Sequence, residues 1–211
     1  MDEKERLSAF MSALTTEHFV LQTAASATTS EAGTRASLYI FALSSSLVAM
    51  GFASRSPDVF VPFVAIVLPA VFILGVFTAV RLVDSNLEGM HFLMGIARIR
   101  GYYRTLTPEA ADHFAAEAGR WPEAQATPAL RLGVLVGFMT TTASMVAFIN
   151  SIVAGVGIAL LAGDLLPGNQ IVLASSVGVI VALLLMAAFL GYQRWRYRIY
   201  EPVERHEGRQ D

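Results

Sequence analysis

The stretch VFTAVRLVDSNLEGMHFLMGIARIRGYYR, residues Val76–Arg104, decides the fold because it joins an apolar segment to a charged one without interruption. It contains no proline, and the helical period of about 3.6 residues continues past the charge boundary at Arg81. We therefore expect one helix that leaves a lipid bilayer and continues into the cytoplasm. Projected at about 100° per residue, one side of this helix is polar. This polar stripe consists of Arg81, Asp84, Ser85, Glu88, His91, Gly95, Arg98 and Tyr102.

The composition is that of a membrane protein. Of the 211 residues, 55% are hydrophobic and only 15% are charged, whereas soluble domains carry about 25% charged residues. The net charge of −2 and the lack of a long basic run give no indication of a nucleic-acid partner. The chain contains no cysteine, which excludes disulfides, thiolate metal sites and cysteine nucleophiles. We assign no cofactor, no metal site and no catalytic residue, and the first partner that we expect is the lipid bilayer.

Four apolar segments predict an all-α integral membrane protein with four transmembrane helices. They are residues 36–53, 60–80, 132–162 and 171–191, with outer turns at 54–59 and 163–170. With both termini inside, 14 of the 15 Lys and Arg residues are cytoplasmic and only Arg55 is outside. This distribution follows the positive-inside rule. We therefore expect a multi-pass protein of the bacterial cytoplasmic (inner) membrane with its N- and C-termini inside.

The predicted organisation has five parts. They are an N-terminal cytoplasmic amphipathic helix (1–35), transmembrane helices 1 and 2 (36–83), a cytoplasmic helical extension and loop (84–131), transmembrane helices 3 and 4 (132–192) and a cytoplasmic basic and aromatic tail (193–211).

The N-terminal segment predicts an amphipathic helix or two, because apolar residues recur at helical spacing from Leu7 to Ala25. His18 lies within this apolar face. We favour a half-buried histidine that is hydrogen-bonded to a neighbour over a ligand or a proton sensor. Thr28-Thr-Ser-Glu31 has the spacing of a capping box, so we expect a new helix to start there. A further short helix is predicted from Thr107-Pro108 to about Gly119.

Uncharged polar and small residues distinguish the third span. None of the four spans contains an acidic, basic or histidine residue, which argues against a pump or a proton-coupled transporter. Small and polar residues allow close helix approach, and they can also line a pore. We favour packing inside the bundle, with Asn150 bonded to a partner helix or to its own copy in another subunit. The residues assigned to pore lining or helix packing are Gly133, Gly137, Thr141, Ser144, Asn150 and Ser151.

Charged residues outside the spans offer two weaker site hypotheses. Glu88-x-x-His91 has the spacing of carboxylate metal sites in helical bundles. No second such pair occurs, so we favour a polar stripe in which Arg81 and Arg98 pair with its acidic residues. The basic residues near the spans are either topology determinants or contacts for a lipid headgroup or another anion. These residues are Arg100, Arg104, Arg194, Arg196 and Arg198.

Three strings resemble a family of uncharacterised bacterial four-span integral membrane proteins. They are LTTEHFVLQTA (Leu14–Ala24), SEAGTRASLY (Ser30–Tyr39) and RLVDSNLEG…ARIRGYY (Arg81–Tyr103). The resemblance covers the first half of the chain most clearly and includes the four-span layout. It implies no activity. It implies only a recurring pattern that contains Glu17, His18, Arg35, Arg81, Arg98, Arg100, Tyr102 and Tyr103.

Three classes of function fit this sequence. The first is a homo-oligomeric membrane assembly that forms a channel or pore, and we give it a slight preference. The second is a membrane-anchored scaffold or sensor that presents cytoplasmic helices to a protein partner. The third is an enzyme at the inner membrane face. That enzyme would use Glu17, His18, Glu88 and His91, and no nucleophile, phosphate-loop or two-histidine motif supports it.

Overall fold

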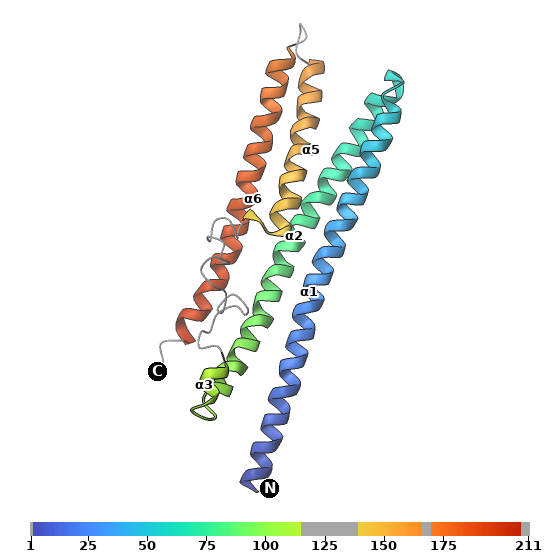
Figure 1. Ribbon diagram of the computed structural model, residues 1–211. Coiled ribbons are helices and arrows are strands. Elements are labelled where there is room, and N and C mark those ends of the chain that lie inside the picture. The colour runs from blue at the N-terminus through green and yellow to red at the C-terminus, as the bar shows by residue number, and fades with distance from the viewer. Residues whose placement is uncertain (1, 115–138, 166–169, 208–211) are drawn as a thin grey trace. The chain divides into compact units, whose positions relative to one another are not determined.

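The computed structural model describes residues 2–114, 139–165 and 170–207 (Figure 1). Every regular element within these ranges is a helix. In chain order the helices are α1 (Glu3–Ala53), α2 (Pro57–Arg104), α3 (Ala110–His113), α5 (Thr142–Leu165) and α6 (Ile171–Glu207). Four of them, α1, α2, α5 and α6, are long and apolar enough to cross a membrane. The prediction of an all-α chain with four such helices is confirmed.

Helix α2 is unbroken from Pro57 to Arg104, as predicted for Val76–Arg104. In Figure 1 it runs as a single ribbon from cyan to green. It begins at Pro57, earlier than the expected start of the second span, because a proline in the first turn lacks only an N–H that has no partner there. The preceding turn is short, and the Ser56 N–H donates to the Ala53 carbonyl at 3.0 Å.

Helix α1 is also unbroken, from Glu3 to Ala53, so the predicted new helix at Thr28 is wrong. The Thr28 hydroxyl donates to the Ala25 carbonyl at 2.8 Å. It therefore bonds back onto its own helix, as Ser and Thr do within helices, and does not cap a new one. At about 1.5 Å per residue, the 51 residues of α1 span about 76 Å. This exceeds twice the roughly 30 Å of a hydrocarbon core.

The third span begins later than predicted. Thr140 and Thr141 form a turn and a bend, and α5 starts at Thr142. The expected single helix from Leu132 is therefore wrong at this point, while residues 132–138 lie outside the described ranges. The Thr141 hydroxyl accepts the Ser144 N–H at 3.2 Å. Thr141 thus caps α5, which explains why the helix starts at Thr142.

The remaining helix ends also differ in detail. α3 begins at Ala110, after the predicted start at Thr107-Pro108. The Thr107 hydroxyl accepts the Ala110 N–H at 3.2 Å. Residues 115–119 of that predicted helix lie outside the described part of the chain. At the other end, α6 continues as a helix to Glu207, through most of the segment that we assigned to a tail.

The chain forms two compact units. The first unit comprises residues 1–32 and 84–136, and the second comprises residues 33–83 and 137–211. Within the first unit α1 and α2 pack antiparallel. The rings of Phe10 and Tyr102 meet edge to face at 5.4 Å. Further along, Leu21 lies against Gly95, and Thr28 lies against Gly89.

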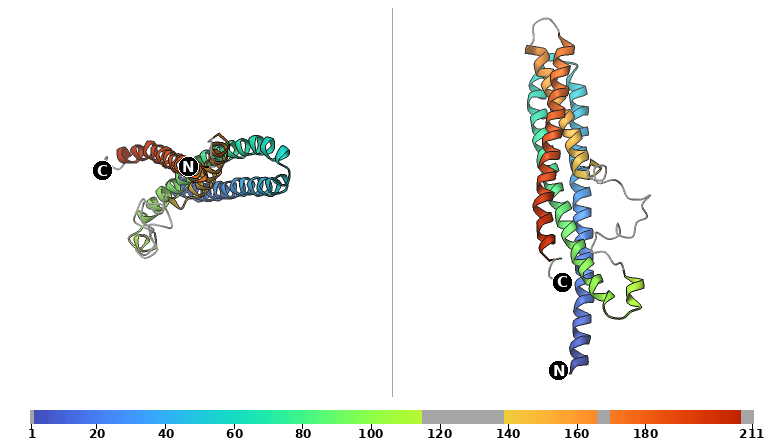
Figure 2. Two further views of the ribbon diagram at one scale, coloured as in Figure 1. Left: turned by 90° about the horizontal axis from the view of Figure 1, so that it is seen from above. Right: turned by 90° about the vertical axis from the view of Figure 1, so that its left-hand side faces the viewer.

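Within the second unit α5 packs along α6 (Figures 1 and 2). The buried residues between helices are mostly small, among them Ala143, Ala147 and Ala174. The large apolar side chains lie outside. Val172 is 81% exposed, and Phe41 and Phe77 are each 70% exposed. Soluble proteins rarely expose large continuous apolar patches, so this arrangement suits a lipid environment.

Candidate functional site

Asn150 is the centre of a buried polar contact in the second unit. It lies on α5 and is 4% exposed. Its Oδ1 accepts a hydrogen bond from the Tyr39 hydroxyl of α1 at 3.2 Å. Its Nδ2 donates to the Phe72 carbonyl of α2 at 3.1 Å. One side chain therefore joins three helices of the same chain. An amide in an apolar span needs such partners, because an unsatisfied polar group there is costly.

Gly75 provides the space for this contact. A Cβ atom at Gly75 would collide with the Asn150 side chain and would lie 2.8 Å from Cε2 of Tyr39. Any side chain at this position of α2 would therefore displace the asparagine. We refer to Tyr39, Phe72, Gly75 and Asn150 as the asparagine node.

A second buried polar cluster joins the start of α5 to α6. The Ser144 hydroxyl donates to Oε1 of Gln193 at 3.0 Å, and Nε2 of Gln193 donates to the Thr141 hydroxyl at 3.2 Å. Ser144 is 1% exposed and Gln193 is completely buried. We call these three residues the glutamine node. Thr141 and Ser144 were expected from the sequence, whereas Gln193 was not. The available signal was an amide at the end of an apolar span, which needs a hydrogen-bond partner there.

A close crossing of α5 and α6 accounts for other small residues. A Cβ atom on Gly155 would lie 2.6 Å from the Gly178 carbonyl oxygen. On Gly178 it would lie 2.8 Å from Cβ of Ala159 and would collide with the Gly155 carbonyl. This is the small-residue contact that brings membrane helices together. Nearby, Ser151 is buried, and its hydroxyl donates to the Ala147 carbonyl at 2.7 Å. The predicted pair Gly133 and Gly137 lies outside the described residues.

The polar stripe of α2 is only partly exposed. Glu88, His91 and Arg98 are exposed, whereas Arg81, Asp84, Gly95 and Tyr102 are half-buried. Its charged members each make at least one polar, ring or electrostatic contact. Ser85 departs from the prediction, because it is 2% exposed and its hydroxyl has no hydrogen-bond partner among the described residues.

The structure does not bring together the four residues of the enzyme hypothesis. Glu88 neighbours Gly89, which faces Thr28 of α1. Thr28 lies ten residues beyond His18 on α1. Glu88 and His18 are therefore about 15 Å apart along the helix axis. His18 is half-buried as expected, but its Nδ1 is buried without a hydrogen-bond partner among the described residues. Glu17 and His91 are both exposed.

The basic residues divide between the two units. Arg100 and Arg104 of α2 are half-buried in the first unit. In the second unit Arg194 and Arg198 of α6 are exposed, and Arg196 is half-buried. Within the described ranges, no group of three or more His, Asp or Glu side chains could hold a metal ion.

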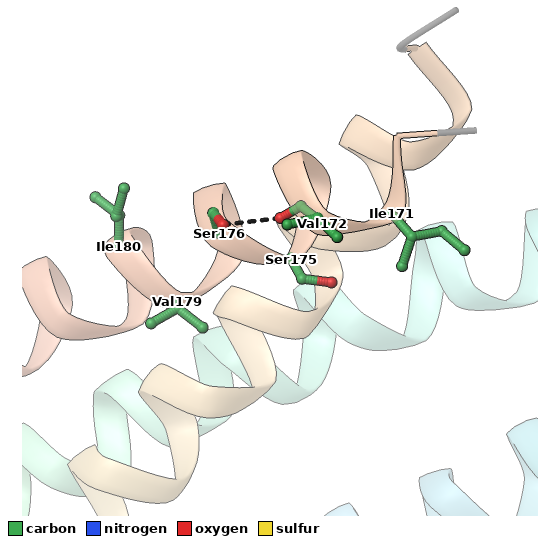
Figure 3. Close-up of a pocket in the computed structure, with 6 residues that line it drawn as sticks. All are labelled: Ile171, Val172, Ser175, Ser176, Val179 and Ile180. Atoms are coloured by element: carbon green, nitrogen blue, oxygen red, sulfur yellow. Dashed lines mark hydrogen bonds between the residues drawn. The ribbon is translucent and has the colours of Figure 1, made fainter. Parts of the chain in front are cut away.

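The best-defined pockets are shallow depressions on α6. One of about 490 Å³ is lined by Ile171, Val172, Ser175, Ser176, Val179 and Ile180, all from one helix (Figure 3). The Ser176 hydroxyl donates to the Val172 carbonyl at 2.8 Å and is thereby satisfied. This depression shows no converging polar groups of the kind that a ligand site needs.

Comparison with protein-family models, with curated proteins and with solved structures finds no match to the chain. The family resemblance of the three sequence strings therefore stays a prediction. The fold defines an all-helical class in which four helices are long and apolar enough to cross a bilayer.

Proposed function

We propose that this protein is a membrane-anchored scaffold or sensor that presents a helical surface to a cytoplasmic protein partner. The observation that carries the proposal is the continuity of α2, which extends from an apolar span into a segment with exposed Glu88, His91 and Arg98. A helix without a break connects the apolar span directly to this polar segment. The N-terminal part of α1 packs against the same segment and supports it.

The polar residues of the spans favour the scaffold over a channel. A pore lining needs polar groups that face water. Thr141, Ser144 and Asn150 instead bond to other helices of the same chain. The described helices expose mainly apolar side chains at the level of the spans. These groups act as intrachain packing contacts, which is the simpler of the two roles expected for them.

The proposal includes the orientation and the location. We infer a bacterial inner-membrane protein with both termini in the cytoplasm, since only Arg55 of the 15 basic residues would then lie outside. Arg55 lies in the turn between α1 and α2, and the polar stripe lies at the other end of α2. Assembly into a homo-oligomer is part of the proposal. Exposed Ser37, Ser44 and Ser45 on the apolar part of α1 are consistent with it.

The test uses the absence of native cysteine. Single cysteines replace Glu88, His91 or Arg98 for cross-linking in intact cells, and a cysteine at Phe77, an exposed apolar position of the same helix, is the control. We expect one defined protein adduct from the three polar positions and none from Phe77. In parallel, purified protein in liposomes should pass no ions. Ion flux that changes when Asn150 or Thr141 is replaced by Leu would instead establish the channel.

A further inference from the structure

One edge of α6 combines exposed cationic side chains with an open notch. Gly191, Arg194, Trp195 and Arg198 are spaced i, i+3, i+4 and i+7, so they share one face of the helix. All four are exposed, and Trp195 is 56% exposed. Gln193, in the same turn, is completely buried and fixes the rotation of α6 within the second unit. This edge therefore faces away from the packed side of the helix.

Gly191 forms the notch. A Cβ atom built at this glycine meets no heavy atom within 4 Å. Arg194 and Trp195 lie one turn further along the helix, and Arg198 lies two turns further. The backbone at Gly191 is therefore left accessible. On the preceding turns of the same face, Ala187 and Ala188 are small and exposed. Leu183 and Leu184 follow, each 65% exposed. Along α6 this face thus changes from large apolar residues to small residues and then to cations.

A row of aromatic rings marks the boundary level on α6. The rings of Phe189 and Tyr192 lie 6.4 Å apart, and those of Tyr192 and Trp195 lie 6.2 Å apart. Tyr and Trp favour the membrane–water interface because one end of each is apolar and the other is polar. With the rings at that level, the guanidinium groups of Arg194 and Arg198 reach the depth of lipid phosphates.

We propose that Gly191, Arg194, Trp195 and Arg198 bind the headgroup of an anionic phospholipid. The acyl chains lie along Leu183 and Leu184, the glycerol fits over Gly191, and the phosphate accepts hydrogen bonds from the two arginines. A lipid needs an adjacent apolar surface for its acyl chains, whereas a free phosphate ion would not use one. The occupant is therefore a lipid of the surrounding leaflet. This site is independent of the partner surface on α2.

Tryptophan quenching by brominated lipids tests the proposal directly. The chain has two tryptophans, so W121F leaves Trp195 as the only fluorophore. The full-length protein is placed in phosphatidylcholine bilayers that contain equal fractions of brominated phosphatidylglycerol or brominated phosphatidylcholine. Each basic residue near an anionic surface strengthens binding about fivefold. We expect a preference for phosphatidylglycerol of at least about fivefold at Trp195, falling to near parity in R194Q/R198Q.

A second variant removes the notch and keeps the charge. G191L should also weaken the preference, because its side chain occupies the glycerol position. The matched controls are R6Q/R55Q, which makes the same change in charge, and G51L, at an exposed glycine where a Cβ likewise meets nothing within 4 Å. Both controls should retain the preference. Equal quenching by the two lipids in W121F, or an undiminished preference in R194Q/R198Q, would overturn the proposal. If R194Q/R198Q does not fold, an undiminished preference in G191L overturns it.

Discussion

Asn150 of α5 occupies the space that Gly75 of α2 leaves open, and neither residue can change size without affecting the other. The asparagine is satisfied on both sides of its amide, by the Tyr39 hydroxyl and by the Phe72 carbonyl. A polar group that could serve a pore or a subunit contact is instead used to hold three helices of one chain together. The two residues should therefore be energetically coupled.

The first prediction measures this coupling. G75A should lower the free energy of unfolding by about 1–3 kcal/mol, because the added methyl overpacks the asparagine node. The same substitution at Gly51, where a Cβ meets nothing, should be neutral or should gain up to about 1 kcal/mol from helix propensity. Unfolding in mixed detergent gives both values. In an N150A background, G75A should lower the free energy of unfolding by less than it does in the wild type. An additive double mutant would contradict the contact.

The second prediction concerns the crossing of α5 and α6 at Gly155 and Gly178. G178A would push a methyl into the Gly155 carbonyl, so we expect a loss of about 1–3 kcal/mol. G163A is the control, since the nearest atom to a Cβ there, on Ala174, is 4.0 Å away. The same detergent titration measures both variants. Equal stability of G178A and G163A would mean that the two helices do not approach this closely.

The third prediction concerns the glutamine node. Q193L removes the amide that bonds the hydroxyls of Ser144 and Thr141, which keep the 2.9 Å hydrogen bond to each other, and should lower the free energy of unfolding by about 1–3 kcal/mol. S144A should cost less in the Q193L background than in the wild type, because the bond from Ser144 to Gln193 is then already lost. Thermal unfolding of the single and double variants checks this. An equal cost of S144A in the two backgrounds would argue against the bond between Ser144 and Gln193.

The fourth prediction concerns Glu109 at the start of α3. Its own backbone N–H and then the Thr107 hydroxyl donate hydrogen bonds that hold the pKa of this carboxyl below its usual range. A lowered pKa means that the charged form is favoured in the folded chain. Its stabilising contribution is present above the ordinary pKa of a glutamate and is lost as the pH falls through the lowered value. T107V should raise the pKa of Glu109, as measured by carboxyl NMR titration. An unchanged pKa would remove Thr107 as a cause.

The long helices and the spans could be predicted from the sequence because continuous periodicity and hydropathy are local properties. The details that failed depend on which of several possible hydrogen bonds a hydroxyl makes. The string at Thr28 matches a capping box, but within a continuous helix the hydroxyl bonds to Ala25. Thr141 is the second of three consecutive threonines, and only its bond to the Ser144 N–H shows which of them caps α5.

Some candidate residues could be identified from the sequence, whereas the role of others depends on contacts between helices. Asn150 was singled out as a polar group that needs a partner helix or its own copy in another subunit, and in the structure it bonds to Tyr39 and Phe72. The role of Gly75 could not be read from the sequence, because it depends on which helix faces α2 at that level. Gln193 was missed because it stands among aromatic and basic residues that are typical of a membrane interface.

We propose that α2 is one helix that carries a partner surface out of the bilayer, and a spin-label scan tests this proposal directly. Single cysteines from Val76 to Arg104 are labelled in liposomes, and the accessibility of each label to oxygen and to a water-soluble nickel complex is measured. We expect both accessibilities to vary with a period of about 3.6 residues along the whole stretch, with high nickel accessibility at Glu88, His91 and Arg98. Mobile labels without periodicity at residues 84–86, or exclusion of nickel from Glu88, His91 and Arg98, would contradict this proposal.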